Sequence, residues 1–221
     1  MIKPPGIIDN TIELPGRCYA IRMMPHEVDI ADIHDKWDQA YADAMKLIVD
    51  GNVYEGKEIL EELYRRKYNR AGHTLSYGYG AGWFGEPDPK KYLSLVYALV
   101  LKGYSAAFSD YGFCYDCGIG VKKSMRWALY WYRKAADYDD EAQNILGLCY
   151  EEGLGVLKDY EKAYYWFQLA VKNGAGACAE HNLARCFRLG RGISEDKEMA
   201  NKYEELAVKH GFHKKEKGTV I

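Results

Sequence analysis

Residues 146–174 read LGLCYEEGLGVLKDYEKAYYWFQLAVKNG, and this stretch decides the fold. A turn of the form Gly-x-Gly-aliphatic, residues 153–156, separates two runs with helical apolar periodicity. Glycine ends helices readily because it tolerates positive φ, and an aspartate such as Asp159 accepts hydrogen bonds from the free N–H groups of a first helical turn. The stretch therefore predicts an antiparallel helix pair of roughly 35 residues.

Equivalent helix starts recur along the whole chain. The residues that resemble N-caps lie 36, 36, 35 and 37 positions apart: Asn52, Asp88, Ser124, Asp159 and Asp196. Pro89 after Asp88 strengthens one of these starts, and Glu55 three residues after Asn52 suggests a capping box. Positions four, seven and eleven after each cap fall on one helical stripe and are apolar in every unit except at Gly56. We call the helix after each cap helix B.

A second register upstream of the caps predicts the partner of each pair, helix A. It begins seventeen residues before the cap with a small residue, which lets two helices approach closely: Ala71, Ala107, Ala142 and Ala179. The last three units join their helices through the same kind of turn, Gly118–Val121, Gly153–Val156 and Gly190–Ile193. The first glycine is expected to end helix A, the second to turn the chain, and the aliphatic residue to fold back on the core.

The pattern Leu146-Gly147-x-x-Tyr150-x-x-Gly153-x-Gly155-Val156, followed by Asp159, Ala163, Trp166, Ala170 and Gly174, resembles a Sel1-like repeat, a relative of the tetratricopeptide repeat. Residues 71–106 look like a degenerate copy with Trp83-Phe84-Gly85 at the turn, and residues 36–70 are more similar to a tetratricopeptide unit. Because one unit cannot bury both of its stripes, the units must stack. The resemblance implies an all-α fold, a right-handed α-solenoid of stacked antiparallel helix pairs.

The predicted organisation has three parts. Residues 1–35 contain several prolines and show no helical period until about residue 29, which indicates an irregular N-terminal arm. A single solenoid domain is expected over residues 36–211, and a polar C-terminal tail over residues 212–221. The units of the solenoid are expected at about 36–70, 71–106, 107–141, 142–178 and 179–211.

A face for a partner is expected on helix A, beside its buried stripes. In the tetratricopeptide family the corresponding positions line the concave groove, so the resemblance implies that this face binds a protein or peptide. The positions fifteen, eleven and eight before each cap provide the candidate partner-binding residues: His73, Tyr77, Ser109, Phe113, Asp116, Asn144, Leu148, Glu151, His181, Arg185 and Arg188. Tyr77, Phe113 and Leu148 would form an apolar floor with charged residues beyond it. The alternative is that these side chains only pack helix A against the next repeat.

The cysteines and histidines provide weaker candidates for chemistry. Cys114, Cys149 and Cys186 share one register, which is typical of small core residues. Cys114-x-x-Cys117 and Cys178-x-x-His181 have zinc-ligand spacing, but they lie in non-adjacent repeats where four ligands would not converge. No metal and no cofactor are therefore predicted. His210-x-x-His213 is expected to interact with the end of the last helix.

The sequence lacks several common catalytic motifs. The chain has no P-loop, no Gly-x-Gly-x-x-Gly that opens a helix after a strand, no His-Glu-x-x-His and no Gly-x-Ser-x-Gly. The leading prediction is a non-enzymatic adaptor or scaffold, with a bacterial immunity protein that grips a toxin or effector as a narrower alternative. A hydrolase of the cysteine-rich Sel1-like, β-lactamase-like type is a less favoured alternative. A spacer or self-assembly module is the third reading, which the charged outer face of the last helix disfavours.

Composition limits the kinds of partner. With 221 residues, 48% of them hydrophobic, and a formal net charge of −2, the chain is long and apolar enough to bury a core but has no excess of positive charge for a phosphate backbone. The longest apolar run, residues 92–101, is about half of what a membrane-spanning helix needs. We expect a cytoplasmic protein, monomeric when unbound, whose partner is a protein or peptide rather than a nucleic acid or a membrane.

Overall fold

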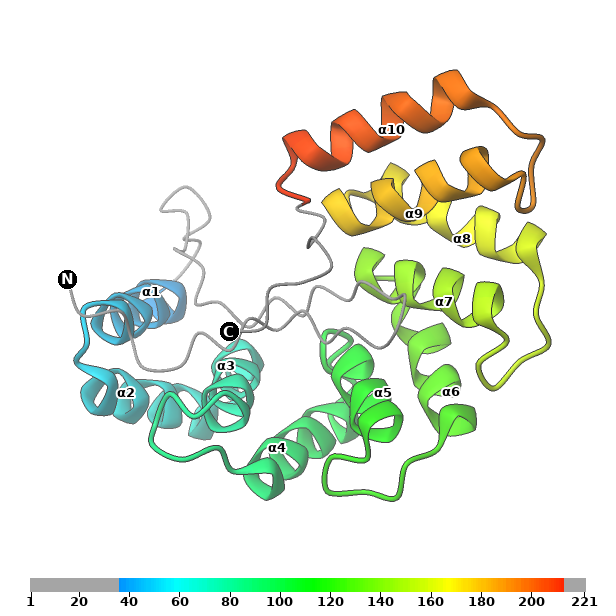
Figure 1. Ribbon diagram of the computed structural model, residues 1–221. Helices are drawn as coiled ribbons and strands as arrows, with labels where there is room; N and C mark the ends of the chain where they lie inside the picture. The colour runs from blue at the N-terminus through cyan, green and yellow to red at the C-terminus, as the bar shows by residue number, and fades with distance from the viewer. Residues whose placement is uncertain (1–35, 213–221) are drawn as a thin grey trace. The chain divides into compact units, whose positions relative to one another are not determined.

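The computed structural model describes residues 36–212, and this part of the chain is built of α-helices with no strand (Figure 1). Its helices are α1 (Lys36–Val49), α2 (Val53–Arg65), α3 (Asn69–Gly80), α4 (Pro89–Leu101), α5 (Ala107–Cys117), α6 (Met125–Ala135), α7 (Asp140–Glu152), α8 (Tyr160–Asn173), α9 (Gly176–Leu189) and α10 (Lys197–Lys209). The odd-numbered helices are the predicted helices A and the even-numbered ones the helices B. The predicted N-terminal arm and residues 213–221 of the predicted tail lie outside the described residues.

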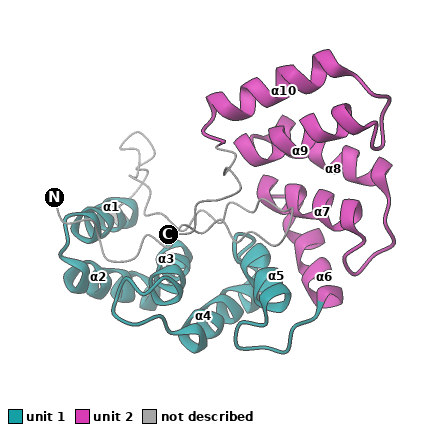
Figure 2. Ribbon diagram, in the orientation of Figure 1, with its two compact units in different colours: residues 1–11, 21–124 teal, residues 12–20, 125–221 magenta. Residues whose placement is uncertain are grey.

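The described helices belong to two compact units (Figure 2). Unit 1 contains α1 to α5, and unit 2 contains α6 to α10. Within unit 1, α1 packs on α2 and α3 on α4; within unit 2, α7 packs on α8 and α9 on α10. The predicted fold class, an all-α solenoid of helix pairs, is confirmed. One continuous domain over residues 36–211 stays a prediction.

Every helix B begins one residue after the cap that the sequence indicates. The side chains of Asp88, Asp159 and Asp196 accept hydrogen bonds from backbone N–H groups in the first turns of α4, α8 and α10. Asn52 makes no such bond, so the expected capping box at α2 is wrong. The reason lies in its backbone, because a ψ of 56° departs from the extended conformation in which a cap side chain reaches the N–H groups.

Three of the four helices A begin two or three residues earlier than their alanines suggest, at Asn69, Asp140 and Gly176. Asp139 explains one of these starts, since its carboxylate accepts hydrogen bonds from the backbone N–H groups of Glu141 and Ala142 at 3.0 and 3.3 Å. The four alanines are nonetheless fully buried: Ala71, Ala107, Ala142 and Ala179. Close helix contact at this register is therefore confirmed.

The Gly-x-Gly turns behave as the sequence indicates. Gly118, Gly153 and Gly190 end α5, α7 and α9 in the left-handed conformation. The second glycine of each turn also has positive φ and lies against the preceding helix B; a Cβ at Gly155 would be 2.8 Å from the side chain of Leu129 on α6. The aliphatic residue of the last turn is an exception. Ile193 is exposed, and no helix pair follows α10 among the described residues to cover it.

The core of each unit lies between helices A and B. On helix B, positions four and eleven after the cap are buried throughout, whereas position seven is half-buried and position eight is buried in the first four units. The glycine exception at position four has a steric cause: a Cβ on Gly56 would be 2.6 Å from the carbonyl oxygen of Ala44, so glycine lets α2 approach α1. Leu60 and Phe167 centre the cores of units 1 and 2.

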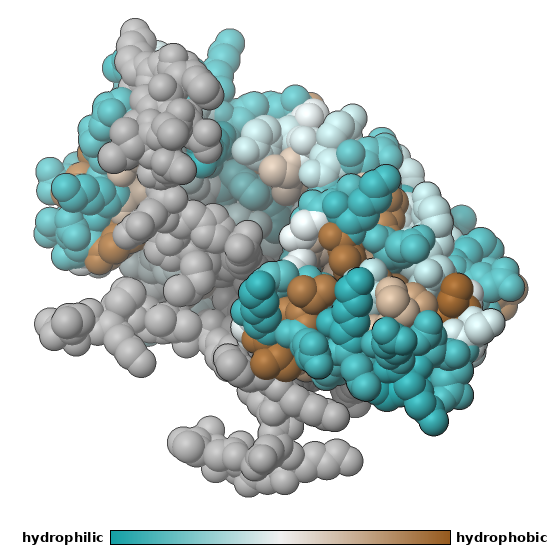
Figure 3. Space-filling model, turned by 90° about the horizontal axis from the view of Figure 1, so that it is seen from above, coloured by the Kyte–Doolittle hydropathy of each residue, from teal (hydrophilic) through white to brown (hydrophobic). Residues whose placement is uncertain are grey.

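The surface of the described part is mixed in character. Figure 3 shows small hydrophobic patches enclosed by hydrophilic residues on the face that it presents. Scattered patches of this kind are normal for a folded protein, so a binding surface must be argued from particular residues. None of the described helices combines the length and the apolar character needed to cross a bilayer.

Candidate functional site

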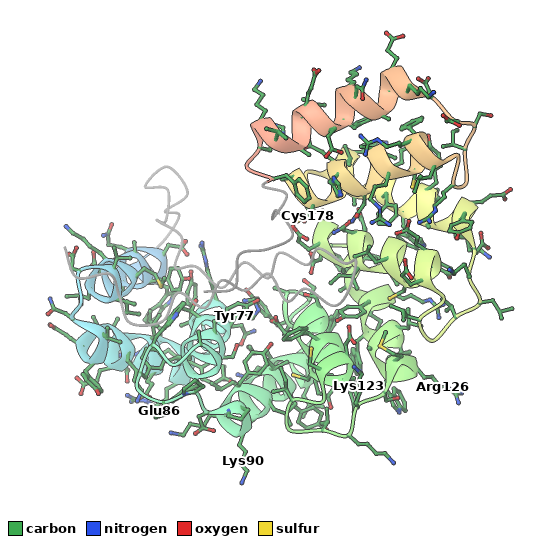
Figure 4. All side chains as sticks on the ribbon, in the orientation of Figure 1. Tyr77, Glu86, Lys90, Lys123, Arg126 and Cys178 are labelled. Atoms are coloured by element: carbon green, nitrogen blue, oxygen red, sulfur yellow. The ribbon has the colours of Figure 1, made fainter. Side chains whose placement is uncertain are left out.

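The predicted partner-binding residues are carried by four helices A, two in each unit. In unit 1, His73 and Tyr77 lie on α3, and Ser109, Phe113 and Asp116 on α5. In unit 2, α7 carries Asn144, Leu148 and Glu151, and α9 carries His181, Arg185 and Arg188. Figure 4 shows Tyr77 extending from α3 on the side away from α4, as expected for this face.

In unit 1 a buried aspartate joins α3 to α5. The carboxylate of Asp110 accepts a hydrogen bond from the Tyr77 hydroxyl at 2.9 Å and pairs with Nε2 of His73 at 2.6 Å. The ring of His73 also lies edge-on to the rings of Tyr77 and Tyr104, with centroids 4.8 and 5.6 Å apart. Burial raises the pKa of Tyr104. This cluster holds the two rings of α3 in place and leaves them half-buried.

In unit 2 a chain of hydrogen bonds links α7 to α9. Asn182 donates to Asn144 at 2.9 Å and accepts from Arg185 at 3.1 Å. Arg185 in turn donates to Oε1 of Glu151 at 2.8 Å, and Arg191 donates to the same oxygen at 2.7 Å. Two guanidinium groups thus share one buried carboxylate. The hydrogen bond to Glu151 raises the pKa of Arg191.

The remaining face residues of α9 pair with α10. Nδ1 of His181 lies 3.1 Å from a carboxylate oxygen of Glu204, and the Arg188 guanidinium lies 3.4 Å from the same oxygen. The His181 ring stacks on Phe212 with centroids 4.1 Å apart. Around α9, therefore, Arg185, Arg188 and Arg191 form ion pairs with two carboxylates, Glu151 and Glu204.

Four of the predicted face residues are buried: Asp116, Asn144, Leu148 and Glu151. The prediction that Leu148 belongs to an exposed apolar floor is wrong, because it lies in a core cluster with Phe167 and Leu183. The physical reason is the stacking of helices A, since α7 packs on α9 as well as on α8. For the three positions on α7 the alternative holds, namely packing of helix A against the next repeat. The other seven positions are half-buried or exposed: His73, Tyr77, Ser109, Phe113, His181, Arg185 and Arg188.

Four residues that organise the site were not among the predicted ones: Asp110, Asn182, Arg191 and Glu204. Asp110 and Asn182 both stand fourteen residues before a cap, where Thr74 also stands, and all three are buried. The recurrence of a polar residue at this position of helix A was the sequence signal that could have identified Asp110 and Asn182. Arg191 lies in a turn and Glu204 on a helix B, so no helix-A register points to either.

Three cysteines that share one register behave as core residues, whereas Cys117 is exposed. Cys114, Cys149 and Cys186 are fully buried, which confirms the prediction. Burial raises the pKa of the Cys114 and Cys186 thiols to about 12, so neither is a reactive thiolate at neutral pH. Within residues 36–212, no group of three or more His, Cys, Asp and Glu side chains is placed to hold a metal ion. His210 pairs with Glu180 at 2.9 Å, and His213 lies outside the described residues.

Acidification is expected to weaken unit 2 through His181. Burial lowers the pKa of this histidine below its ordinary value of 6.5, and the nearby arginines act in the same direction against the opposing effect of Glu204. The unfolded chain therefore binds the proton more tightly than the folded one, so the free energy of unfolding falls as the pH drops below 6.5. Urea titrations on both sides of this pH should show a smaller decrease for His181→Gln than for the parent protein. If the free energy of unfolding changes with pH in the same way for both proteins, His181 is not responsible for the loss of stability in acid.

Taken alone, the described geometry defines a class of protein. Consecutive antiparallel helix pairs joined by Gly-x-Gly turns are characteristic of an α-helical repeat protein.

Comparison with known proteins places the chain within that class. The family model described as Sel1 repeat matches residues 109–138, 140–174 and 179–212. This part of the chain therefore carries three Sel1 repeats, and a Sel1-repeat fold suggests protein–protein interaction. No protein with curated annotation matches the sequence.

Solved structures agree with this family. The Sel1 repeat protein from Oxalobacter formigenes is similar with a TM-score of 0.71 and 25% identity, covering 78% of this chain and 70% of that one. The protein c5321, a protective antigen present in uropathogenic Escherichia coli strains and displaying an SLR fold, has a TM-score of 0.65 and 28% identity over 71% of this chain. This chain matches only 33% of the length of c5321. The immunity protein Pa5087 from Pseudomonas aeruginosa is less similar, with a TM-score of 0.46 and 21% identity. The match covers 80% of this chain and 83% of that one.

Proposed function

We propose that this protein is an adaptor or scaffold that binds a partner protein or peptide through its helix-A face. We define this face by the seven predicted residues that retain exposed surface: His73, Tyr77, Ser109, Phe113, His181, Arg185 and Arg188. The proposal rests on the residue types of this face, which include the rings of Tyr77 and Phe113 and the guanidinium groups of Arg185 and Arg188. Aromatic side chains and arginine are the residues that protein interfaces enrich, and hot spots concentrate in them.

The two units contribute different chemistry to the proposal. In unit 1 the face offers two rings: Tyr77 on α3, which is held in place by Asp110, and Phe113 on α5, the next helix A. In unit 2 it offers arginines that are already oriented by carboxylates, and Arg188 is 41% exposed. A pre-oriented side chain loses less entropy when a partner binds. We therefore expect the partner to present apolar side chains to unit 1 and carboxylates to unit 2.

Binding should depend on the rings of unit 1. The protein, tagged and captured from its native cells, is expected to return one stoichiometric protein, whose affinity for the purified chain is then measured by calorimetry. Replacing two rings, Tyr77→Ala with Phe113→Ala, should weaken binding at least about 10-fold, because interface aromatic residues are frequent hot spots. Circular dichroism of the double variant should retain the helical signal.

Two controls separate binding from folding. Tyr77→Phe keeps the ring but removes the hydroxyl that donates to Asp110, so it tests whether stability alone accounts for the loss. Tyr54→Ala with Tyr138→Ala removes two rings that are 71% and 73% exposed and lie off the face. If the partner binds the Tyr77 and Phe113 double variant as tightly as the parent, the helix-A face is not the binding surface. A captured partner that proves to be a toxin or effector would favour the narrower immunity hypothesis.

A further inference from the structure

Helix α6 carries only basic charges, a property that it shares with α4. It contains Arg126, Arg133 and Lys134 and no acidic residue. One side of the helix is buried through Ala128, Leu129, Tyr132 and Ala135. On the other side, Trp127 is 52% exposed and Tyr130 is 43% exposed. We call Arg126, Trp127, Tyr130, Arg133 and Lys134 the α6 patch.

The cations of the α6 patch have no carboxylate partners among residues 36–212. Lys134 instead lies over the rings of Tyr130 and Trp131, 5.2 and 5.7 Å from their centroids. Arg133 donates a hydrogen bond of 3.3 Å to the hydroxyl of Tyr150 on α7. Figure 4 shows Arg126 on the outer side of α6. Three positive charges thus lie on an aromatic surface with no salt bridge to the described part of the chain.

Helix α8 provides an internal comparison, because Tyr165 and Trp166 occupy the same register as Tyr130 and Trp131. Tyr165 is 55% exposed, so exposed rings at this position belong to the repeat pattern. On α8, however, Lys162 is paired with Asp159 at 2.6 Å, and Glu161 lies in the first turn. Helix α4 also lacks acidic residues, but its Lys91 pairs with Asp88 at 3.9 Å. Among the described helices B, α6 is thus the one in which no basic residue forms a salt bridge.

From this arrangement we infer that the α6 patch is a second interaction surface, which takes an acidic segment of a protein that also carries apolar side chains. Carboxylates of the segment would pair with Arg126, Arg133 and Lys134, and its apolar side chains would cover Trp127 and Tyr130. Charge complementarity of this kind steers association and fixes register. A nucleic acid is a poorer occupant because the chain as a whole is acidic, with a net charge of −2. A bilayer is poorer too, because only two exposed rings are available for insertion. This surface lies on a helix B and does not depend on the helix-A face.

The test uses the full chain and a fluorescein-labelled synthetic peptide of repeated Glu-Leu-Asp-Phe. Fluorescence anisotropy should show saturable binding that weakens at least about 10-fold in the triple variant Arg126→Glu, Arg133→Glu, Lys134→Glu, since three attractive contacts become repulsive. Trp127→Ala should weaken binding as well, which separates a specific surface from simple charge attraction. All three basic residues are exposed, so the helical signal in circular dichroism should be unchanged.

A matched control makes the result specific to α6. The variant Lys172→Glu, Lys202→Glu, Lys209→Glu changes the net charge equally at three exposed positions on α8 and α10, and should leave peptide binding unchanged. The inference is overturned if the parent protein does not bind the peptide, or if the control variant loses binding as strongly as the α6 variant. It is also overturned if vesicles containing phosphatidylglycerol, or a single-stranded oligonucleotide, bind the parent more tightly than the peptide and lose that binding in the α6 variant.

Discussion

Gly192→Ala is expected to destabilise the protein by about 3 kcal/mol, the combined effect of a strained backbone and an overpacked contact. Gly192 has a φ of +76°, a conformation that alanine adopts at a cost. In addition, a Cβ at this position would lie 2.0 Å from the carbonyl oxygen of Tyr160 and 2.6 Å from its carbonyl carbon. These are backbone atoms at the start of α8, so no side-chain rotation can relieve the clash. The loop between α9 and α10 would have to move away from α8.

A neighbouring glycine provides the control for this prediction. Gly190 has a φ of +62°, but the atom nearest to an added Cβ is 3.6 Å away. Gly190→Ala should therefore show only the backbone effect, about 1 kcal/mol. The comparison is made from urea unfolding curves followed by circular dichroism, with both variants and the parent under the same conditions. Equal destabilisation by the two substitutions would show that the turn does not approach α8 as closely as described.

Glu151→Ala is expected to cost about 2–3 kcal/mol, somewhat less than removal of one partner from a fully buried ion pair. The Glu151 side chain is 1% exposed and neutralises both Arg185 and Arg191, whose side chains are 20% and 32% exposed. Without the carboxylate, these two guanidinium groups repel each other at the junction of α7 and α9. Their partial exposure lets water compensate for part of the loss, which sets the lower figure.

The adjacent residue offers a matched control. Glu152 is exposed and has the same charge, so Glu152→Ala should change the free energy of unfolding by less than about 0.5 kcal/mol. A double-mutant cycle that combines Glu151→Ala with Arg185→Ala should give a favourable coupling energy, because the two side chains are in direct contact. If the two variants Glu151→Ala and Glu152→Ala unfold at the same midpoint concentration of urea, the Glu151 carboxylate does not stabilise the contact between α7 and α9.

The stability of this junction bears on the proposed binding face. Arg185 lies on the helix-A face and is held there by Glu151, and its other contact, Asn182, is itself held by Asn144. Buried polar residues of α7 thus orient an arginine that remains partly exposed on α9. Glu151 and Asn144 were predicted to contact a partner directly. Their burial assigns them the indirect role of positioning the arginine.

Local features of the chain were predictable from sequence. All five helices B begin one residue after the indicated caps, and the glycines of the Gly-x-Gly turns adopt positive φ. Caps and turns depend on a few consecutive residues, whose backbone requirements can be deduced from their chemistry without knowledge of the neighbours. The interval between caps then identified the repeat, and with it the all-α solenoid of helix pairs.

The tertiary structure alone decided which side chains of the helix-A face remain accessible. Leu148 and Phe113 occupy the same register in their repeats, yet Leu148 is fully buried in a core cluster while Phe113 is half-buried. The tertiary structure was also needed to identify Asp110 as the residue that bonds both His73 and Tyr77. The same is true of Glu151, which pairs with two arginines. The physical reason is that exposure and ion pairing depend on neighbours more than thirty residues away along the chain. A periodic pattern specifies the face of one helix, but the helices stacked beside it determine how much of that face is left uncovered.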